Sequence, residues 1–410
     1  MNSRNLYLDM KPVEEAKAIF QSAIEANSGR QTEWIPSTQA AGRVTAEAVF
    51  AKYSSPMFNA SAMDGIAVIS ANTAEASTTR PLVLHGDRDY LVVDTGDPVH
   101  APYDAVIMAE DTVETPEGMR IVDSIAPWDN IRPVGEDIVA GEMILTGHHR
   151  LRPVDIGVLL SAGITKLHVL RKPTVAIFPT GTEIIEPTET PVEGSIIESN
   201  SRMFESLVND QGGAAVRYPI LKDSYEEIRD SVSEAVRKHD MVIINAGSSA
   251  GREDFTVHVL RELGEVLVHG VAIKPGKPVI LAMVQGKPVV GLPGYPVSAY
   301  IGFLNFVSPV LSYLTGLPEE RPPVVDAVMT RRLVSSLKHK EYVRVKVGQV
   351  GDRIIAAPLT RGAGAAMSLV RADGFCVIDQ NSEGVEAGET VPVLLTGDPE
   401  AIPRTLVAIG

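Results

Sequence analysis

From about residue 173 to residue 314 this chain alternates short apolar strands with amphipathic helices, and this feature constrains its fold more than any other. Such alternation is typical of a parallel sheet with crossover helices, whose ligands usually lie in loops at the carboxyl ends of the strands. The pattern predicts, in order, strand 174–178, helix 199–211, strand 214–219, helix 224–238, strands 241–245, 265–271, 279–283 and 289–292, and a long helix over 297–314.

The rest of the 410-residue chain has other patterns, and its length exceeds what one hydrophobic core usually serves. An apolar stripe predicts a helix over 12–26. Between Trp34 and about Ile164, short apolar runs separated by Gly, Pro, Asp and Asn predict a β-rich region, with a short helix at 153–162. The proline-rich segment 318–323 is typical of a linker, and the strand-like runs after it predict a small β-domain.

Charge and cysteine content exclude several classes of protein. The chain has 37 Lys and Arg against 52 Asp and Glu, a formal charge of −15, which argues against a nucleic-acid or anionic-membrane surface. Its single cysteine, Cys376, lies in an apolar run and is expected to be buried. The N-terminus lacks the apolar core of a signal peptide, and no apolar run approaches the ~18 residues of a membrane span. We therefore expect a cytoplasmic protein.

A glycine-rich segment, Asn245 to Phe255, follows an apolar strand and leads into a predicted helix. Backbone N–H groups at Gly247 and Gly251, and the hydroxyl of Ser249, suit an anion, and Asp254 suits a metal or a ligand donor. A glycine-rich turn followed by a helix-capping acid, with no ligand, explains the same residues equally well. The segment alone does not favour one interpretation over the other.

Two lysines project from the stiff turn Lys274-Pro275-Gly276-Lys277-Pro278, in which prolines fix the backbone on both sides of a glycine. Paired ammonium groups suit phosphate or another oxyanion, although solvated lysines on a hairpin are favoured when the turn is taken alone. Further along, Pro293 and Pro296 connect a strand to a helix. They predict either a pocket wall or a rigid connection.

Acidic turns recur along the chain, near Asp64, Asp94, Asp137 and Glu183. Each alone is typical of an Asx turn or a helix cap. Together they provide several carboxylates that can meet in one cleft, as a hard cation such as Mg²⁺ requires.

Five of these segments carry a resemblance to a known family. They occur in the same order, and with similar spacing, as in the molybdopterin molybdenumtransferases and the E domain of gephyrin, and the match covers nearly the whole chain. The segments are Ser61–Gly65, Thr180–Glu183, Gly247–Asp254, Lys274–Pro278 and Leu292–Pro296.

The resemblance implies a mixed α/β multidomain protein that forms an elongated homodimer. Four subdomains are expected in each chain: a molybdopterin-binding α/β domain with a parallel sheet, a β-rich insertion, a linking N-terminal subdomain and a C-terminal β-barrel. Their expected ranges are 1–26 and 173–318 for the α/β domain, 49–140 for the insertion, 27–48 and 141–172 for the linking subdomain, and 319–410 for the barrel.

The activity implied is the insertion of molybdate into adenylated molybdopterin, with Mg²⁺, in a cleft shared by two subunits, and with release of AMP. By resemblance the catalytic residues are Asp64, Glu183, Asp254, Lys274 and Lys277, with Glu183 and Asp254 as metal ligands and Asp64 and Thr95 supplied by the partner subunit. The substrate-binding residues are Thr95, Asp137, Asp223, Gly247, Ser249, Gly251, Pro293, Pro296, Arg344 and Ser368.

Some letters depart from the family pattern. Ala246-Gly247 replaces the usual pair of glycines, Ser248 and Ala250 fill small apolar positions, and Tyr295 replaces an asparagine. A tungstate-handling paralogue and a non-catalytic molybdopterin-binding scaffold are therefore alternatives. An enzyme that adenylylates molybdopterin is a third, although it would not require the insertion and the C-terminal domain that the sequence predicts.

Overall fold

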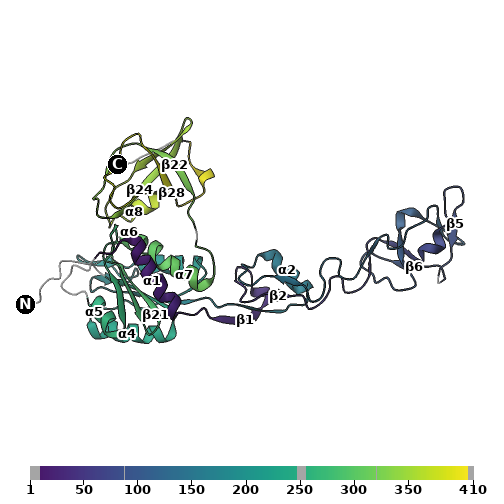
Figure 1. The fold of residues 1–410 in the computed structure, drawn as a ribbon, viewed down its shortest axis with the longest axis horizontal. Coiled ribbons are helices and arrows are strands. Elements are labelled where there is room, and N and C mark those ends of the chain that lie inside the picture. The colour runs from purple at the N-terminus through teal and green to yellow at the C-terminus, as the bar shows by residue number, and fades with distance from the viewer. Residues whose placement is uncertain (1–9, 87, 247–254, 320, 405–410) are drawn as a thin grey trace, which may run out of the picture. The chain divides into compact units, whose positions relative to one another are not determined.

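The computed structural model describes residues 10–86, 88–246, 255–319 and 321–404 (Figure 1). It divides the chain into two compact units: unit 1, which comprises residues 1–31 and 171–410, and unit 2, which comprises residues 32–170. Unit 1 contains an α/β domain and a β-barrel. The predicted mixed α/β multidomain fold is confirmed.

The α/β domain is built on a six-stranded sheet with the order β16-β13-β17-β21-β20-β18. Its first four strands are parallel neighbours, as the alternating pattern predicted. The strands are β13 (Thr174–Pro179), β16 (Ala214–Arg217), β17 (Met241–Ala246), β18 (Glu265–His269), β20 (Ile280–Val284) and β21 (Lys287–Pro293).

Strands β20 and β18 run antiparallel to their neighbours, so the sheet is not parallel throughout. Only two residues, Gln285 and Gly286, connect β20 to β21, and both have positive φ angles, of 50° and 74°. A two-residue connection of this kind forms a tight hairpin, whereas a parallel crossover needs a dozen or more residues. The hairpin therefore fixes the direction of β20.

Helices cover both faces of this sheet (Figure 1). One apolar core contains Phe20, Phe204 and Phe303 from helices on one face, and the other contains Ile228 and Leu260 from helices on the opposite face. The helices of the first face are α1 (Val13–Asn27), α3 (Asn200–Asp210), α6 (Pro296–Gly302), the π-helical turn η4 (Phe303–Val307) and α7 (Ser308–Thr315); those of the second are α4 (Tyr225–Lys238) and α5 (Thr256–Leu263).

The predicted long helix over 297–314 is formed by α6, η4 and α7 in succession. Among the described residues, Pro296–Thr315 is long and apolar enough to cross a membrane by length and composition. However, 67% of its most apolar window is buried within the protein. Its apolar character is that of a core helix, because the side chains pack on the sheet.

The C-terminal domain is a closed five-stranded barrel, in the order β24-β25-β22-β28-β26, with β26 pairing back to β24. Its core includes Val343, Val345, Val393 and Cys376, which is 1% exposed as predicted. The strands are β22 (Val324–Met329), β24 (Lys340–Val350), β25 (Arg353–Pro358), β26 (Gly374–Ile378) and β28 (Thr390–Leu395), with a short pair β23 (Leu333–Val334) and β27 (Gly384–Val385), a helix α8 (Met367–Arg371) and a 3₁₀ turn η5 (Pro399–Ala401).

One short strand of the α/β domain continues into the barrel sheet. Strand β19 (Ile273–Lys274) pairs in parallel with the start of β24, with Ile273 opposite Lys340 and Lys274 opposite Glu341. Helix α1 also contacts the start of β24, because the Lys340 ammonium donates to Glu14 Oε1 at 3.0 Å. The predicted turn Lys274–Pro278, which we call the basic turn, therefore begins where the α/β domain and the barrel share backbone hydrogen bonds.

Unit 2 is β-rich, with several small sheets and separate small cores, as its sequence predicted. The predicted helix at 153–162 is α2 (Pro153–Ser161). The strands are β1 (Thr32–Pro36), β2 (Val49–Phe50), β3 (Ala60–Ser61), β4 (Gly65–Val68), β5 (Leu82–Leu84), β6 (Tyr90–Val93), β7 (Ala105–Met108), β8 (Thr112–Thr115), β9 (Gly118–Ile121), β10 (Ile131–Arg132), β11 (Met143–Leu145) and β12 (Lys166–Leu170), with 3₁₀ turns η1 (Ser37–Gln39), η2 (Ser70–Thr73) and η3 (Ala109–Asp111).

Candidate active site

Two acidic loops lie side by side at the carboxyl edge of the parallel strands in unit 1. The Thr180 N–H donates to the carbonyl of Asn245 at 2.9 Å, and the Gly181 N–H donates to that of Leu221 at 3.1 Å. The next N–H, of Thr182, donates to Asp223 Oδ2 at 3.2 Å. The structure therefore brings the predicted residues Glu183 and Asp223 into neighbouring loops.

Glu183 itself is half-buried, and its carboxylate makes no hydrogen bond or ion pair with the described residues. Gly181, at a φ of 145°, makes room for it: a Cβ atom added to this glycine would lie 3.1 Å from Glu183 Oε2. A side chain there would also be strained at this φ. The loop therefore presents a carboxylate that no side chain or N–H group of the described residues engages.

A pair of buried amides, which the sequence interpretation missed, ties the ends of two strands to the start of helix α3. Asn245 Nδ2 donates to the carbonyl of Pro293 at 2.8 Å, and Asn200 Nδ2 donates to Asn245 Oδ1 at 3.0 Å and to the carbonyl of Gly294 at 2.7 Å. Asn245 is the last residue but one of β17, so the signal was a polar residue near the end of an apolar strand. The predicted residues Gly247, Ser249, Gly251 and Asp254 follow it and lie outside the described residues.

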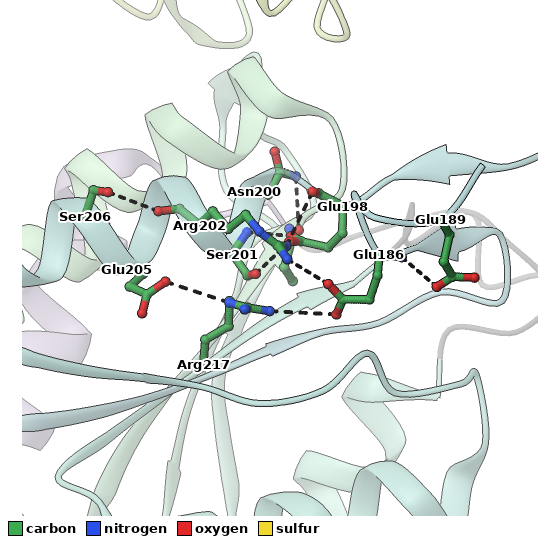
Figure 2. A network of polar contacts seen from close by, with 10 residues as sticks. Glu186, Glu189, Glu198, Asn200, Ser201, Arg202, Glu205, Ser206 and Arg217 are labelled. Atoms are coloured by element: carbon green, nitrogen blue, oxygen red, sulfur yellow. Dashed lines mark hydrogen bonds and ion pairs between the residues drawn. The ribbon is translucent and has the colours of Figure 1, made fainter. Parts of the chain in front are cut away.

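A second polar network fixes the segment after Glu183 against helix α3 (Figure 2). Buried Glu198 accepts from the N–H of Ser201 at 2.7 Å and from its hydroxyl at 2.8 Å, and it is ion-paired with Arg202. Arg202 also donates to Glu186 Oε2 at 2.6 Å, and this contact raises the pKa of the Arg202 guanidinium. The strands β14 (Ile184–Ile185) and β15 (Ile196–Ile197) close the same loop.

The basic turn holds its two lysines in different surroundings. Lys274 Nζ lies 3.3 Å from Glu341 Oε1, whereas the exposed Lys277 makes no ion pair with the described residues. A Cβ atom on Gly276 would lie 3.4 Å from the carbonyl oxygen of Ser298, so the turn packs against the start of α6. Lys274 is thus engaged by the barrel, and Lys277 is left without an ionic partner in the part of the chain that the structure describes.

Arg344 and Ser368, both predicted from the resemblance, lie together in the barrel. Arg344 is 2% exposed, and its Nε donates to Ser368 Oγ at 3.1 Å. Its Nη2 donates to the carbonyls of Thr360 at 2.6 Å and Gly362 at 3.1 Å. Burial, and then the neighbouring Arg361 charge, lower the pKa of Arg344.

The predicted wall residues Pro293 and Pro296 lie at the end of β21 and the first turn of α6. Tyr295, between them, is 61% exposed. A Cβ atom on Gly364 would lie 3.3 Å from the Tyr295 ring, and the Val297 N–H donates to the carbonyl of Ala363 at 3.1 Å. A barrel loop therefore packs directly against this wall.

Unit 2 brings together two of its three predicted residues. Asp64 Oδ1 accepts from both the N–H and the hydroxyl of Thr95, each at 2.7 Å. The Thr95 hydroxyl, followed by its N–H, lowers the pKa of Asp64, so this exposed carboxylate stays ionised. Asp137 lies in another exposed turn, where its N–H donates to the carbonyl of Ser55 at 3.0 Å, and within the described residues no hydrogen bond joins it to Asp64.

No three His, Cys, Asp or Glu residues cluster as a metal site within the described part of the chain. Mg²⁺, however, is commonly held by one or two carboxylates together with waters and substrate phosphates. Glu183, with its available oxygens, fits that requirement. The second predicted ligand, Asp254, lies outside the described residues.

The fold and these contacts define a class: a multidomain α/β protein with acidic loops at the strand ends and a basic turn backed by a β-barrel. Three family profiles match the chain in order. They are the MoeA N-terminal region (domains I and II) over residues 11–163, the "probable molybdopterin binding domain" over residues 176–313, and the MoeA C-terminal region (domain IV) over residues 326–396.

Relatives match along almost the whole length. A protein of Methanocaldococcus jannaschii named "putative molybdopterin biosynthesis protein" is 33% identical over 95% of this chain and 99% of its own. The molybdopterin molybdenumtransferase of Staphylococcus aureus is 27% identical over 94% and 95%. A crystal structure of the molybdopterin biosynthesis MoeA protein of Pyrococcus horikoshii, 31% identical, matches 95% of this chain and 100% of that chain with a TM-score of 0.79. The chain belongs to the MoeA family.

Proposed function

We propose that this protein is a molybdopterin molybdenumtransferase, which inserts molybdate into adenylated molybdopterin and releases AMP. Family membership supports a role in molybdenum-cofactor biosynthesis, and the Staphylococcus aureus relative bears the name of this transferase. The observation that carries the proposal is that the acidic loops and the basic turn both pack where β21 ends and α6 begins. The acidic loops reach Pro293 through Asn245, and the basic turn reaches the following helix through Gly276 and Ser298.

This arrangement suits a reaction between two negatively charged partners. Molybdate is a dianion and the adenylate link carries negative charge, so their approach must overcome repulsion. Lys277 is placed to offset charge on the oxyanion, and the buried Arg344 guanidinium, held by Ser368, adds positive charge on the barrel side. Because Cys376 is buried, and burial raises its pKa to about 11, no covalent step through a thiol is proposed.

Mg²⁺ is part of the proposal, with Glu183 and Asp254 as its protein ligands. Bound there, it would neutralise phosphate charge and help to align the attacking and leaving oxygens. The role of Glu183 in this arrangement is to present an unengaged carboxylate from a loop that is fixed on both sides, by Asp223 and by the contacts of α3.

A homodimer completes the proposed site. Asp64 and Thr95 of the partner subunit would line the cleft, which is supported by the exposure of both residues and by the hydrogen bonds that fix them together. A reducing compartment such as the cytoplasm is also proposed, because the single cysteine is free and buried.

The deciding experiment supplies the purified protein with adenylated molybdopterin, Mg²⁺ and either molybdate or tungstate. We expect AMP release that depends on molybdate. Release with tungstate alone would indicate a tungstate-handling enzyme, and tight binding without turnover would indicate a scaffold. ATP consumption with free molybdopterin would instead identify the adenylylating reaction and overturn the proposal.

A further inference from the structure

We propose that Glu341 is a positioning residue: it holds Lys274 and Arg361 where the basic turn meets the barrel, so that Lys277 and Arg344 face the oxyanion. The inference rests on the proposed function for the identity of the anion. The ion pairs themselves belong to the described structure.

Glu341 is a buried charge with two cationic partners. It is 2% exposed, and its Oε1 lies 3.3 Å from Lys274 Nζ and 3.4 Å from Arg361 Nη1. Its other oxygen, Oε2, is buried without a hydrogen-bond partner among the described residues. Burial of an unpaired carboxylate is unfavourable in free energy, so these ion pairs must offset the desolvation of Glu341.

Backbone pairing fixes this contact. Lys274 and Glu341 are register partners in the parallel pair β19–β24, which places their side chains next to each other. Arg361 reaches the same oxygen from the loop after β25, and it is anchored by donation to the carbonyl of Val334 at 2.8 Å. Three chain segments from two domains thus converge on one carboxylate.

The same carboxylate balances a crowded group of positive charges. The charge of Arg361 lowers the pKa of buried Arg344, after the larger effect of burial, while Glu341 opposes that shift. Lys277 and Lys274 similarly lower the pKa of His339, again after burial. Without the Glu341 charge, Lys274 and Arg361 would repel each other and Arg344, and the Lys274 side chain would lose its ion pair with the barrel.

The first test measures binding of molybdate alone by isothermal titration calorimetry to the full chain carrying Glu341→Gln. We expect about tenfold weaker binding, the change that a coupling in the middle of the usual range produces. Glu341→Asp, which keeps the charge, should recover most of the affinity. Glu14→Gln is the matched control, because Glu14 pairs with Lys340 on the same strand at the same junction, and it should change affinity less than twofold.

A double-mutant cycle distinguishes positioning from general loss of structure. If Glu341 acts through Lys274 to position Lys277, adding Glu341→Gln to Lys274→Met should weaken binding no further, and adding it to Lys277→Met should weaken binding by less than it does in the wild type. Additive effects with Lys274→Met would overturn the proposal. So would tighter binding by Glu341→Gln, because it would show the carboxylate to be only a repelling charge.

A second readout does not depend on the proposed function. The rate of amine labelling at each lysine, followed by peptide mass spectrometry, should rise about threefold at Lys274 in Glu341→Gln and stay constant at Lys277. In Glu14→Gln the rise should move to Lys340. If the wild-type protein binds no molybdate, the proposed function fails while the labelling pattern still decides the positioning role; unchanged labelling at Lys274 would refute it.

Discussion

The acidic loops at the strand ends and the basic turn of unit 1 differ in whether their charged side chains are already engaged. At this acidic edge, backbone N–H groups, buried amides and the ion pairs of Arg202 fix the loops, and the Glu183 carboxylate remains unengaged among the described residues. At the basic turn, the β19–β24 pairing fixes the backbone, and Lys274 is already engaged by the buried carboxylate of Glu341. Both sides thus combine backbone contacts with ion pairs, but only the basic turn pairs one of its own predicted site residues.

This difference predicts how each side responds to change. No contact among the described residues depends on the Glu183 side chain, so Glu183 can be altered without disturbing its loop. The basic side is a coupled group of charges, in which removal of one member shifts the others. Substitutions on the acidic edge should therefore affect chemistry alone, whereas those on the basic turn should affect binding and stability together.

The largest effect is expected for Glu183→Ala. Loss of the presented carboxylate should lower AMP release by at least about a hundredfold, the scale on which removal of one transition-state contact acts. Thermal unfolding should be unchanged. Glu193→Ala, an exposed acid in the same connection, is the control and should retain full activity. A folded Glu183→Ala protein with wild-type activity would remove the metal-binding role of this edge.

An intermediate effect is expected for Lys277→Met. A hydrogen bond to a charged group contributes about 1.5–3 kcal/mol, so molybdate binding should weaken by roughly ten- to a hundredfold. Lys287→Met provides the comparison, because Lys287 pairs with Asp240 at the opposite end of β21. Equal affinities for Lys277→Met and wild type, measured by calorimetry, would show that this lysine is only a solvated surface charge.

The smallest effect concerns pH. Burial, followed by the charges of Lys277 and Lys274, lowers the pKa of His339 below its ordinary value of 6.5. The unfolded chain therefore binds this proton first, and the stability due to neutral His339 is present above pH 6.5 and is lost as the pH falls below it. His239, whose pKa is also lowered by burial, adds to the same loss.

Urea unfolding at pH 7.5 and pH 5.5 measures this loss. Between these two pH values, the free energy of unfolding should fall less in His339→Gln than in the wild type. The difference between the two proteins should be less than about tenfold in the folding constant per pH unit, which is the limit for one proton. An identical pH dependence of stability in the two proteins would show that protonation of His339 does not contribute to the loss.

Much of the architecture follows from the sequence, because strands and helices leave clear periodic patterns. The strands and helices of the α/β domain, the β-rich region and α2 lie where apolar spacing predicts them. The antiparallel direction of β20 was missed, since periodicity does not report strand direction; the two-residue connection at Gln285 and Gly286 was the available signal.

The candidate site was predictable only in part. Glu183, Asp223, Arg344 and Ser368 came from motif resemblance, and the structure places them in two pairs of neighbours. Glu341 was missed because a charged residue inside a strand of alternating polarity is usually taken to face solvent. Its burial depends on Lys274, which is 67 residues earlier in the chain, and no local pattern connects the two.

The single, protected cysteine has a practical consequence. Because Cys376 is 1% exposed and its pKa is raised to about 11, ordinary maleimide chemistry near neutral pH should leave it untouched. A new thiol placed on an exposed residue of each unit would then be the sole target for a dye or spin label. Distances between the two units, with and without substrate, become directly measurable in solution without first building a cysteine-free background.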